Sequence, residues 1–166
     1  MLSHLHFVQK KIHTRETLAK QLALWRFEGK KIAFTNGCFD IVHLGHVESL
    51  ALAADCGDVL VVGLNSDASV RLQGKSPMRP LQNEISRATV LASMRFVSAV
   101  IGFDELTPYE LIDFIQPDVL VKGGDYKVEE IAGHDIVLKR GGEVKLIPLV
   151  QGYSTTTIEN KIRAGA

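Results

Sequence analysis

Two histidines three residues apart, His43 and His46, are the side chains of this sequence best suited to chemistry. They follow a short predicted strand and a glycine turn, and they stand where a helix is expected to begin. Backbone N–H groups at a helix start attract anions, and imidazoles can donate hydrogen bonds to the same oxygens. Gly45 between them leaves room for a triphosphate. The pattern predicts a phosphate site made by both histidines together with Asn36, Gly37, Cys38, Phe39 and Asp40.

The same turn has other interpretations. The histidines could instead satisfy local backbone groups, whereas a closed zinc site needs more ligands than two histidines and Asp40. We therefore predict no metal held by the protein itself. Cys38 is better explained as a small turn residue than as a nucleophile, because no histidine–acid arrangement accompanies it. Asp40 fits two roles equally well: orienting a basic group or a magnesium-bound water, or satisfying amides of the turn.

Two glycine-containing segments follow other predicted strands. At 122–126, Lys-Gly-Gly-Asp-Tyr lets backbone groups approach a flat base, although Gly-Gly-Asp is also an ordinary turn. At 152–156, Gly-Tyr-Ser-Thr-Thr precedes the last predicted helix, where hydroxyls and amides could hold the β- and γ-phosphates. A plain capping box of Thr156 with Glu159 is the alternative there. The nucleotide-binding residues expected from these segments include Gly123, Ser154, Thr155 and Thr156.

The hydrophobic pattern predicts the elements that position these segments. Strands are expected at 32–35, 59–64, 97–101, 119–121 and 144–147. Helices are expected at 15–28, after His43, at 82–95 and within 129–140. Two more helices are expected to begin at a Thr107–Glu110 capping box and at Thr156, the second with Ile158 and Ile162 inside. Residues 66–80 are expected to form a loop. The alternation indicates an α/β fold with a Rossmann-like, doubly wound parallel sheet of about five strands. Ligands bind such sheets beyond the strands' carboxyl ends, which adds Asn65 and Asp67 as substrate-binding candidates.

Composition excludes several classes of partner. The 166 residues carry 19 basic and 19 acidic side chains, so nothing favours a nucleic acid. Two cysteines are too few for a disulfide framework and favour a reducing compartment. The longest apolar run, Val59 to Leu64, is too short to span a bilayer, and the amino terminus lacks the apolar core of a signal peptide. We expect a cytoplasmic protein that has no membrane partner.

The turn and its two histidines resemble the signature of the cytidylyltransferase-like nucleotidyltransferases. The resemblance extends from about Lys31 to Ile162. It implies an enzyme that joins a nucleoside triphosphate to a phosphorylated small molecule and releases pyrophosphate, with Mg²⁺ entering together with ATP. On this basis we expect an N-terminal helical extension at 1–30 and a nucleotidyltransferase domain at 31–166.

Within that family, the Lys122–Tyr126 string looks like that of the heptose 1-phosphate adenylyltransferases. Arg79-Pro80 and Arg87 keep the separation seen in the same branch, and Leu149 stands where glycerol-phosphate enzymes carry an arginine. The resemblance implies transfer of AMP from ATP to D-glycero-β-D-manno-heptose 1-phosphate, with a separate sugar kinase upstream and a homodimeric assembly. It assigns catalytic roles to His43, His46, Lys75 and Arg87, and nucleotide contacts to the residues of the histidine turn and to Lys122, Asp125 and Tyr126. It assigns substrate contacts to Asn65, Asp67, Arg79 and Lys122.

One departure keeps other functions open. Gln73 stands where relatives commonly carry a lysine before the loop glycine, and here Lys75 follows Gly74 instead. Whether Lys75 replaces that lysine is an open alternative. The competing functions are a cytidylyltransferase acting on glycerol 3-phosphate or a similar phosphorylated alcohol, and a non-catalytic nucleotide-binding protein of the same fold.

Overall fold

The computed structural model describes residues 3–74 and 77–165, which contain one sheet of six parallel strands. Across the sheet the order is β1-β4-β3-β2-β5-β6. The strands are β1 (Ile12–His13), β2 (Ile32–Gly37), β3 (Val59–Asn65), β4 (Ala99–Phe103), β5 (Val119–Gly123) and β6 (Glu143–Ile147). The predicted α/β fold is confirmed, but the count of about five strands is one too low. The additional strand, β1, has two residues at the sheet edge, too few to give a recognisable hydrophobic run.

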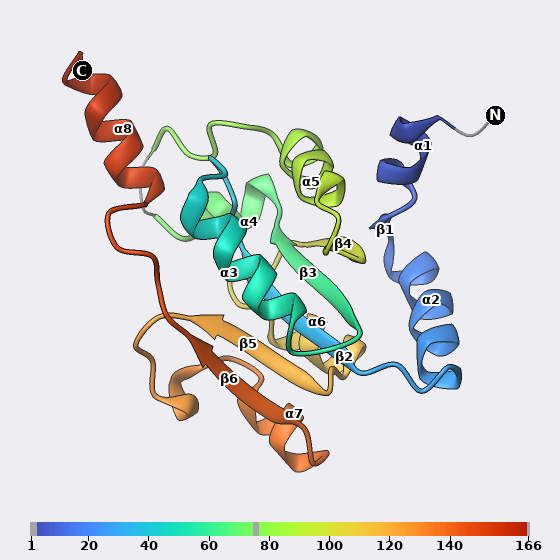
Figure 1. Ribbon diagram of the computed structural model, residues 1–166. Helices are drawn as coiled ribbons and strands as arrows, with labels where there is room; N and C mark the ends of the chain where they lie inside the picture. Colours follow the sequence, from blue (N-terminus) through green and yellow to red (C-terminus); the bar gives the residue numbers. More distant parts are fainter. Residues whose placement is uncertain (1–2, 75–76, 166) are drawn as a thin grey trace.

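Helices cover both faces of the sheet (Figure 1). They are α1 (His4–Gln9), α2 (Arg15–Phe27), α3 (Leu44–Ala54), α4 (Asp67–Leu72), α5 (Glu84–Ser93), α6 (Tyr109–Ile115), the 3₁₀ turn η1 (Val128–Glu130), α7 (His134–Lys139) and α8 (Thr155–Arg163). On one face α2, α6 and α7 pack against Phe34 and Val61. On the other face α3 and α5 pack against Ala33, Leu60 and Val62. Neighbouring strand residues therefore point into opposite cores, as in any sheet buried on both sides.

The prediction of a continuous loop at 66–80 is wrong, because α4 lies within it. The Ser66 hydroxyl accepts the Ser69 N–H at 3.1 Å and starts this helix, and Val70 turns toward the interior. Six residues are too few to show helical periodicity, so α4 leaves only the serine cap as a signal in the sequence.

The structure forms neither of the predicted capping boxes. At α6 the N-cap is Pro108, which offers no side-chain hydrogen bond. At α8 the N-cap is Ser154 rather than Thr156, and its hydroxyl accepts the N–H of Thr157 at 3.0 Å. Ile162, expected to be buried, is 68% exposed, because α8 stands away from the rest of the molecule (Figure 1).

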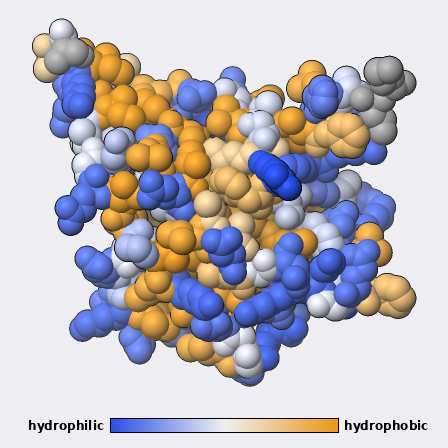
Figure 2. Space-filling view, in the orientation of Figure 1, coloured by the Kyte–Doolittle hydropathy of each residue, from blue (hydrophilic) through white to orange (hydrophobic). Residues whose placement is uncertain are grey.

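The parallel sheet brings the carboxyl ends of β2, β3, β5 and β6 to one edge. The segments 36–46, 122–126 and 152–156, which are predicted to do chemistry, follow the ends of β2, β5 and β6. In the view of Figure 2, hydrophobic side chains gather over α3, whose outward residues include Leu44, Val47 and Leu52.

Within the described ranges, no helix combines the length and apolar character needed to cross a bilayer.

Candidate active site

The turn after β2 has the tight geometry that its glycine suggested. Phe39 adopts a left-handed backbone conformation, with φ of 48°, and its ring is buried. A Cβ on Gly37 would lie 3.0 Å from that ring, so a larger residue would push the ring out of place. The chain thereby reverses within a few residues and delivers His43 to the start of α3.

The two histidines form one stacked pair. Their ring centroids are 3.8 Å apart and their planes are 19° from parallel, and the Phe39 ring meets His46 edge-on at 5.2 Å. The His46 N–H donates to the carbonyl oxygen of His43 at 2.9 Å and, more weakly, to its Nδ1 at 3.4 Å. A Cβ on Gly45 would lie 3.2 Å from the His43 ring. His43 is thus the local helix cap considered in the sequence, yet its Nε2 keeps a proton to donate.

Burial keeps both imidazoles neutral. The pKa of His46 falls to about 4, mainly because burial disfavours the charged ring and secondly because His43 lies beside it, while the Ile41 carbonyl acts in the opposite direction. Burial also lowers the pKa of His43. Nδ1 of His46 is buried without a hydrogen-bond partner in the described structure. The free protein therefore presents neutral donors, and a bound polyphosphate would favour their protonation.

Acidification is expected to destabilise the fold through His46. Its pKa is about 4 in the folded chain and 6.5 for an unperturbed imidazole, so between these values the unfolded chain binds more protons. The free energy of unfolding should therefore fall as the pH drops from 7 toward 4. Urea titrations should show a smaller fall for His46→Gln than for the unchanged protein. Equal falls in the two proteins would contradict the assigned pKa.

The histidine pair opens onto a cleft of about 590 Å³, here called the histidine cleft. Its walls come from the start of α3, the loop before α5, and the segment from β6 into α8. The lining residues are His43, Gly45, His46, Ser49, Arg79, Leu149, Val150, Gln151, Tyr153, Ser154, Thr155 and Thr156. The first amides of α8 have no acceptor inside their own helix, so they too can bind an anion. The structure thus places the histidines and the Ser154–Thr156 segment around one space.

A second cleft of about 240 Å³, here called the lysine pocket, lies beyond the ends of β2, β3 and β5. Its polar lining residues are Asn36, Asn65, Gln73, Thr107, Lys122, Tyr126 and Glu130. Nζ of Lys122 lies 3.3 Å from Oδ1 of Asn36 and 6.0 Å from the centroid of the Tyr126 ring. The amides and hydroxyls, together with the Glu130 carboxylate, can form hydrogen bonds with a small polyhydroxylated molecule, and Lys122 offers a positive charge to a phosphate on it. Asp125, by contrast, is exposed on the loop after β5.

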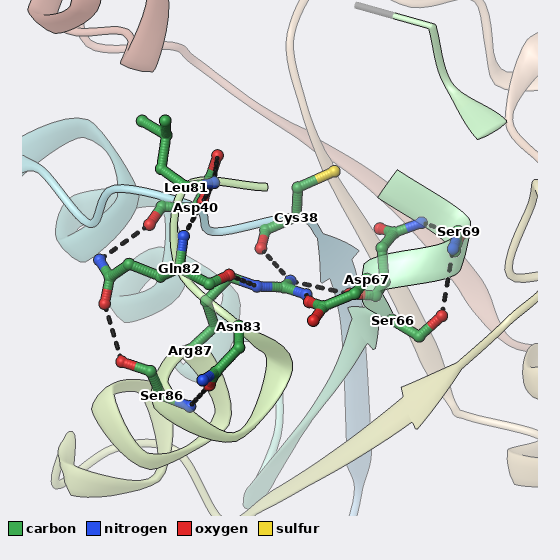
Figure 3. A network of polar contacts seen from close by, with 11 residues as sticks. Cys38, Asp40, Ser66, Asp67, Ser69, Leu81, Gln82, Asn83, Ser86 and Arg87 are labelled. Carbon is green, nitrogen blue, oxygen red and sulfur yellow. Dashed lines mark hydrogen bonds and ion pairs between the residues drawn. The ribbon is translucent and has the colours of Figure 1, made fainter. Parts of the chain in front are cut away.

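Arg87 is directed at the protein's own oxygens. Its side chain is buried and lies at the centre of the network in Figure 3. Nη1 donates to the carbonyl oxygens of Cys38 and Asn65, both at 2.7 Å, and Nε donates to that of Gln82 at 2.9 Å. Nη2 pairs with Asp67 at 2.7 Å. Arg87 and Asp67 thus join the ends of β2 and β3 to the loop before α5, and their contact with phosphate or substrate stays a prediction.

Asp40 satisfies amides, but of a distant segment rather than of its own turn. Its buried carboxylate accepts the N–H groups of Leu81 and Gln82, at 2.8 to 3.0 Å. This fixes the loop before α5 against the histidine turn.

Within the described residues, no group of three His, Cys, Asp or Glu side chains is placed to hold a metal ion. Sγ of Cys38 donates to Oε1 of Gln73 at 3.3 Å, which ties the turn to the end of α4.

Arg79 lies where a cation could meet a bound polyphosphate. Its side chain lines the histidine cleft, where Nε pairs with Glu159 at 2.9 Å and Nη2 lies 3.5 Å from the Thr156 hydroxyl. Lys75, the other predicted loop cation, lies outside the described residues.

Ser49 also lines the histidine cleft, and the sequence analysis did not predict it. It lies one turn after His46 on the same face of α3, so the three-residue spacing could have revealed it.

Comparison with known proteins identifies the family of this chain. The family model described as "Cytidylyltransferase-like" matches residues 34–163, and the chain belongs to this family of nucleotidyltransferase enzymes. Two relatives named "Bifunctional protein HldE", from Wolinella succinogenes and Syntrophotalea carbinolica, are each 51% identical to it. The matches cover 97% and 98% of this chain but 33% of each relative, so the chain spans about a third of their length.

A further HldE protein, from Rhodopseudomonas palustris strain HaA2, is 56% identical over 87% of this chain and 29% of its own length. Among solved structures, a protein titled as the lipopolysaccharide core biosynthesis protein from Thermoplasma volcanium GSS1 aligns with a TM-score of 0.61 and 29% identity. That alignment covers 76% of this chain and all of the other. These matches confirm the family that the histidine turn suggested.

Proposed function

We propose that this chain transfers AMP from ATP to D-glycero-β-D-manno-heptose 1-phosphate, forming ADP-heptose and pyrophosphate. The observation that carries the proposal is the shared cleft, in which the stacked histidines face the start of α8. Such a space suits a triphosphate, because neutral donors and helix-start amides surround it. The described residues that line it include no carboxylate, and Glu159 nearby is paired with Arg79. The likeness to HldE proteins and to a lipopolysaccharide core biosynthesis protein supports the sugar acceptor.

The two clefts divide the substrates between them. ATP places its phosphates in the histidine cleft, and its base meets the backbone around Gly123. The heptose phosphate enters the lysine pocket, where Lys122 offers a charge to the phosphate and Asn36 and Thr107 offer polar groups to the hydroxyls. The turn of residues 36–46 lies between the two clefts, so the reacting phosphorus sits beside it.

Positioning and charge neutralisation account for most of the reaction. A phosphate oxygen of the sugar attacks the α-phosphorus of ATP, while the bond from that phosphorus to the bridging oxygen breaks and pyrophosphate leaves on the opposite side. His43 and His46 donate hydrogen bonds to the α-phosphate and the bridging oxygen, where negative charge grows. Arg79 and Lys75 neutralise the departing pyrophosphate. Arg87 supports the site indirectly, through the loops that it joins.

Nucleotidyltransferases generally use a nucleoside triphosphate with a divalent metal ion. We propose that Mg²⁺ arrives with ATP and is held by phosphate oxygens and water. The carboxylate of Asp40, within the histidine turn, already accepts hydrogen bonds from two backbone amides.

A pyrophosphate-release assay with four substrate pairs tests the proposal. ATP or CTP is combined with heptose 1-phosphate or glycerol 3-phosphate, and kcat/KM is compared. We expect ATP with heptose 1-phosphate to exceed each other pair by at least about tenfold, because a site built to hydrogen-bond one base rejects another. Faster turnover of CTP with glycerol 3-phosphate would favour the cytidylyltransferase alternative. Nucleotide binding without turnover of any pair would favour a non-catalytic protein.

The wider context is also a proposal. A sugar kinase would supply heptose 1-phosphate, and the name of the longer HldE relatives, "Bifunctional protein", agrees with a second activity near this one. We propose that residues 31–166 carry the transfer, that residues 1–30 extend the fold by α1, β1 and α2, that the protein forms a homodimer, and that it acts in the cytoplasm, where ATP is available.

A further inference from the structure

Glu159 lies in α8 and makes the contact that decides where Arg79 points. The two side chains form an ion pair, Nε to Oε1 at 2.9 Å, and both are largely shielded, with exposed fractions of 12% and 14%. A charge-assisted bond of this geometry, removed from solvent, holds its partners more firmly than a surface pair does. Arg79 is also held from the other side, because the loop that carries it is fixed by Asp40 through Leu81 and Gln82.

The two contacts of the Arg79 guanidinium leave donors for a further partner. Glu159 occupies Nε, and Nη2 reaches only a long 3.5 Å contact with the Thr156 hydroxyl. Arg79 and Thr156 both line the histidine cleft. The planar guanidinium carries five N–H groups in a fixed fork, so a carboxylate that binds one edge orients the other edge. Because Arg79 lines the cleft, its remaining donors are within reach of the space that we assign to phosphates.

The same pair attaches α8 to the rest of the site. In Figure 1, α8 stands out from the body of the protein, and the loop before α5 passes close to its first turn. Arg79 reaches from that loop to both Glu159 and Thr156. Because Glu159 lies one turn after the amides of residues 155 and 156, the pair also holds those amides at the cleft.

We propose that Glu159 is a positioning residue of the transfer reaction, which orients Arg79 and the start of α8 toward the polyphosphate. The proposal rests on the proposed function only in placing a triphosphate in the histidine cleft. It makes an unusual claim about charge, since an acidic side chain next to an anion site is said to strengthen anion binding. Simple electrostatics predicts the opposite, because removing a carboxylate reduces repulsion.

That difference in sign gives the test. Calorimetry measures binding of inorganic tripolyphosphate, which requires no acceptor and no turnover. We expect Glu159→Ala to weaken binding by about tenfold, and Glu159→Gln to stay within about threefold of the unchanged protein, because its amide oxygen can still accept from Nε. Asn160→Ala, at the next position of α8, should leave binding unchanged. Stronger binding in Glu159→Ala, or an equal loss in both Glu159 variants, would overturn the proposal.

A double-mutant cycle shows whether Glu159 acts through Arg79. Arg79→Ala should also weaken tripolyphosphate binding by about tenfold, and adding Glu159→Ala should cause no further loss. Additive losses would mean that Glu159 acts independently, which overturns the positioning role. If the substrates are those proposed, Glu159→Ala should raise the KM for ATP with kcat within about threefold.

The two proposals fail in different ways. The protein without substitutions could bind tripolyphosphate but turn over none of the four substrate pairs. That result would contradict the proposed function, and the Glu159 variants could still be compared in tripolyphosphate binding. An unchanged protein that binds no tripolyphosphate overturns the Glu159 proposal, whatever its activity.

Discussion

His46→Ala is expected to lower kcat for pyrophosphate release by about 100- to 1000-fold while the protein stays folded. The ring lines the histidine cleft beside His43, and its pKa of about 4 makes it a neutral donor in the free protein. Loss of one preorganised donor to growing negative charge typically costs this much in rate. The measurement is the steady-state rate with saturating ATP and acceptor, accompanied by circular dichroism of the variant.

Two further variants make this result specific. His46→Gln keeps an N–H donor and should recover part of the lost rate, whereas His4→Ala, on the exposed side of α1, should behave as the unchanged protein. A rate for His46→Ala within about threefold of normal would remove His46 from the reaction. A lost circular dichroism spectrum would instead show that the stacked rings of His43, His46 and Phe39 are needed for folding.

Much of the fold was predictable because its strands are apolar on both faces. The residues of β3 and β5 form short hydrophobic runs, and a parallel sheet covered on two sides requires such runs. The strand β1 and the helix α4 were missed because two and six residues carry too little periodicity. The exposure of Ile162 was missed because an amphipathic pattern shows that a helix has an apolar side but not what lies against that side.

The site was predictable to the extent that its residues are close in sequence or follow strand ends. The histidine pair and the start of α8 meet because parallel strands bring their carboxyl ends to one edge. Long-range partners were not predictable. The local sequence does not indicate that Asp40 contacts the amides of Leu81 and Gln82. Nor does it indicate that Arg79 pairs with Glu159, 80 residues later. Arg87 was expected at the phosphates from the family resemblance. A buried arginine also needs partners within the protein, and no sequence pattern shows that these are the carbonyl oxygens of Cys38 and Asn65 and the carboxylate of Asp67.

Arg87→Met is expected to lower the free energy of unfolding by about 3 to 5 kcal/mol, the largest stability effect that we predict. The substitution fills most of the space but removes every side-chain donor of an arginine that is 1% exposed. It leaves the Asp67 carboxylate without its cation, and it leaves the carbonyl oxygens of Cys38, Asn65 and Gln82 without this donor. Unsatisfied buried acceptors of this kind are costly, and the total stability of a domain is only about 5 to 15 kcal/mol. Urea denaturation followed by circular dichroism measures the loss.

Arg95→Met is the matched control, because it removes the same type of side chain just after α5 at an exposed position, and it should change stability by less than about 0.5 kcal/mol. Asp67→Asn is a milder test of the same network, since the amide oxygen can still accept from Nη2 while the carboxylate charge is lost. Its cost should fall between those of the two arginine variants. If Arg87→Met is as stable as Arg95→Met, then Arg87 does not hold the loops of the site together. A direct contact with phosphate, the role first expected for Arg87, would then be the better explanation of any loss of activity.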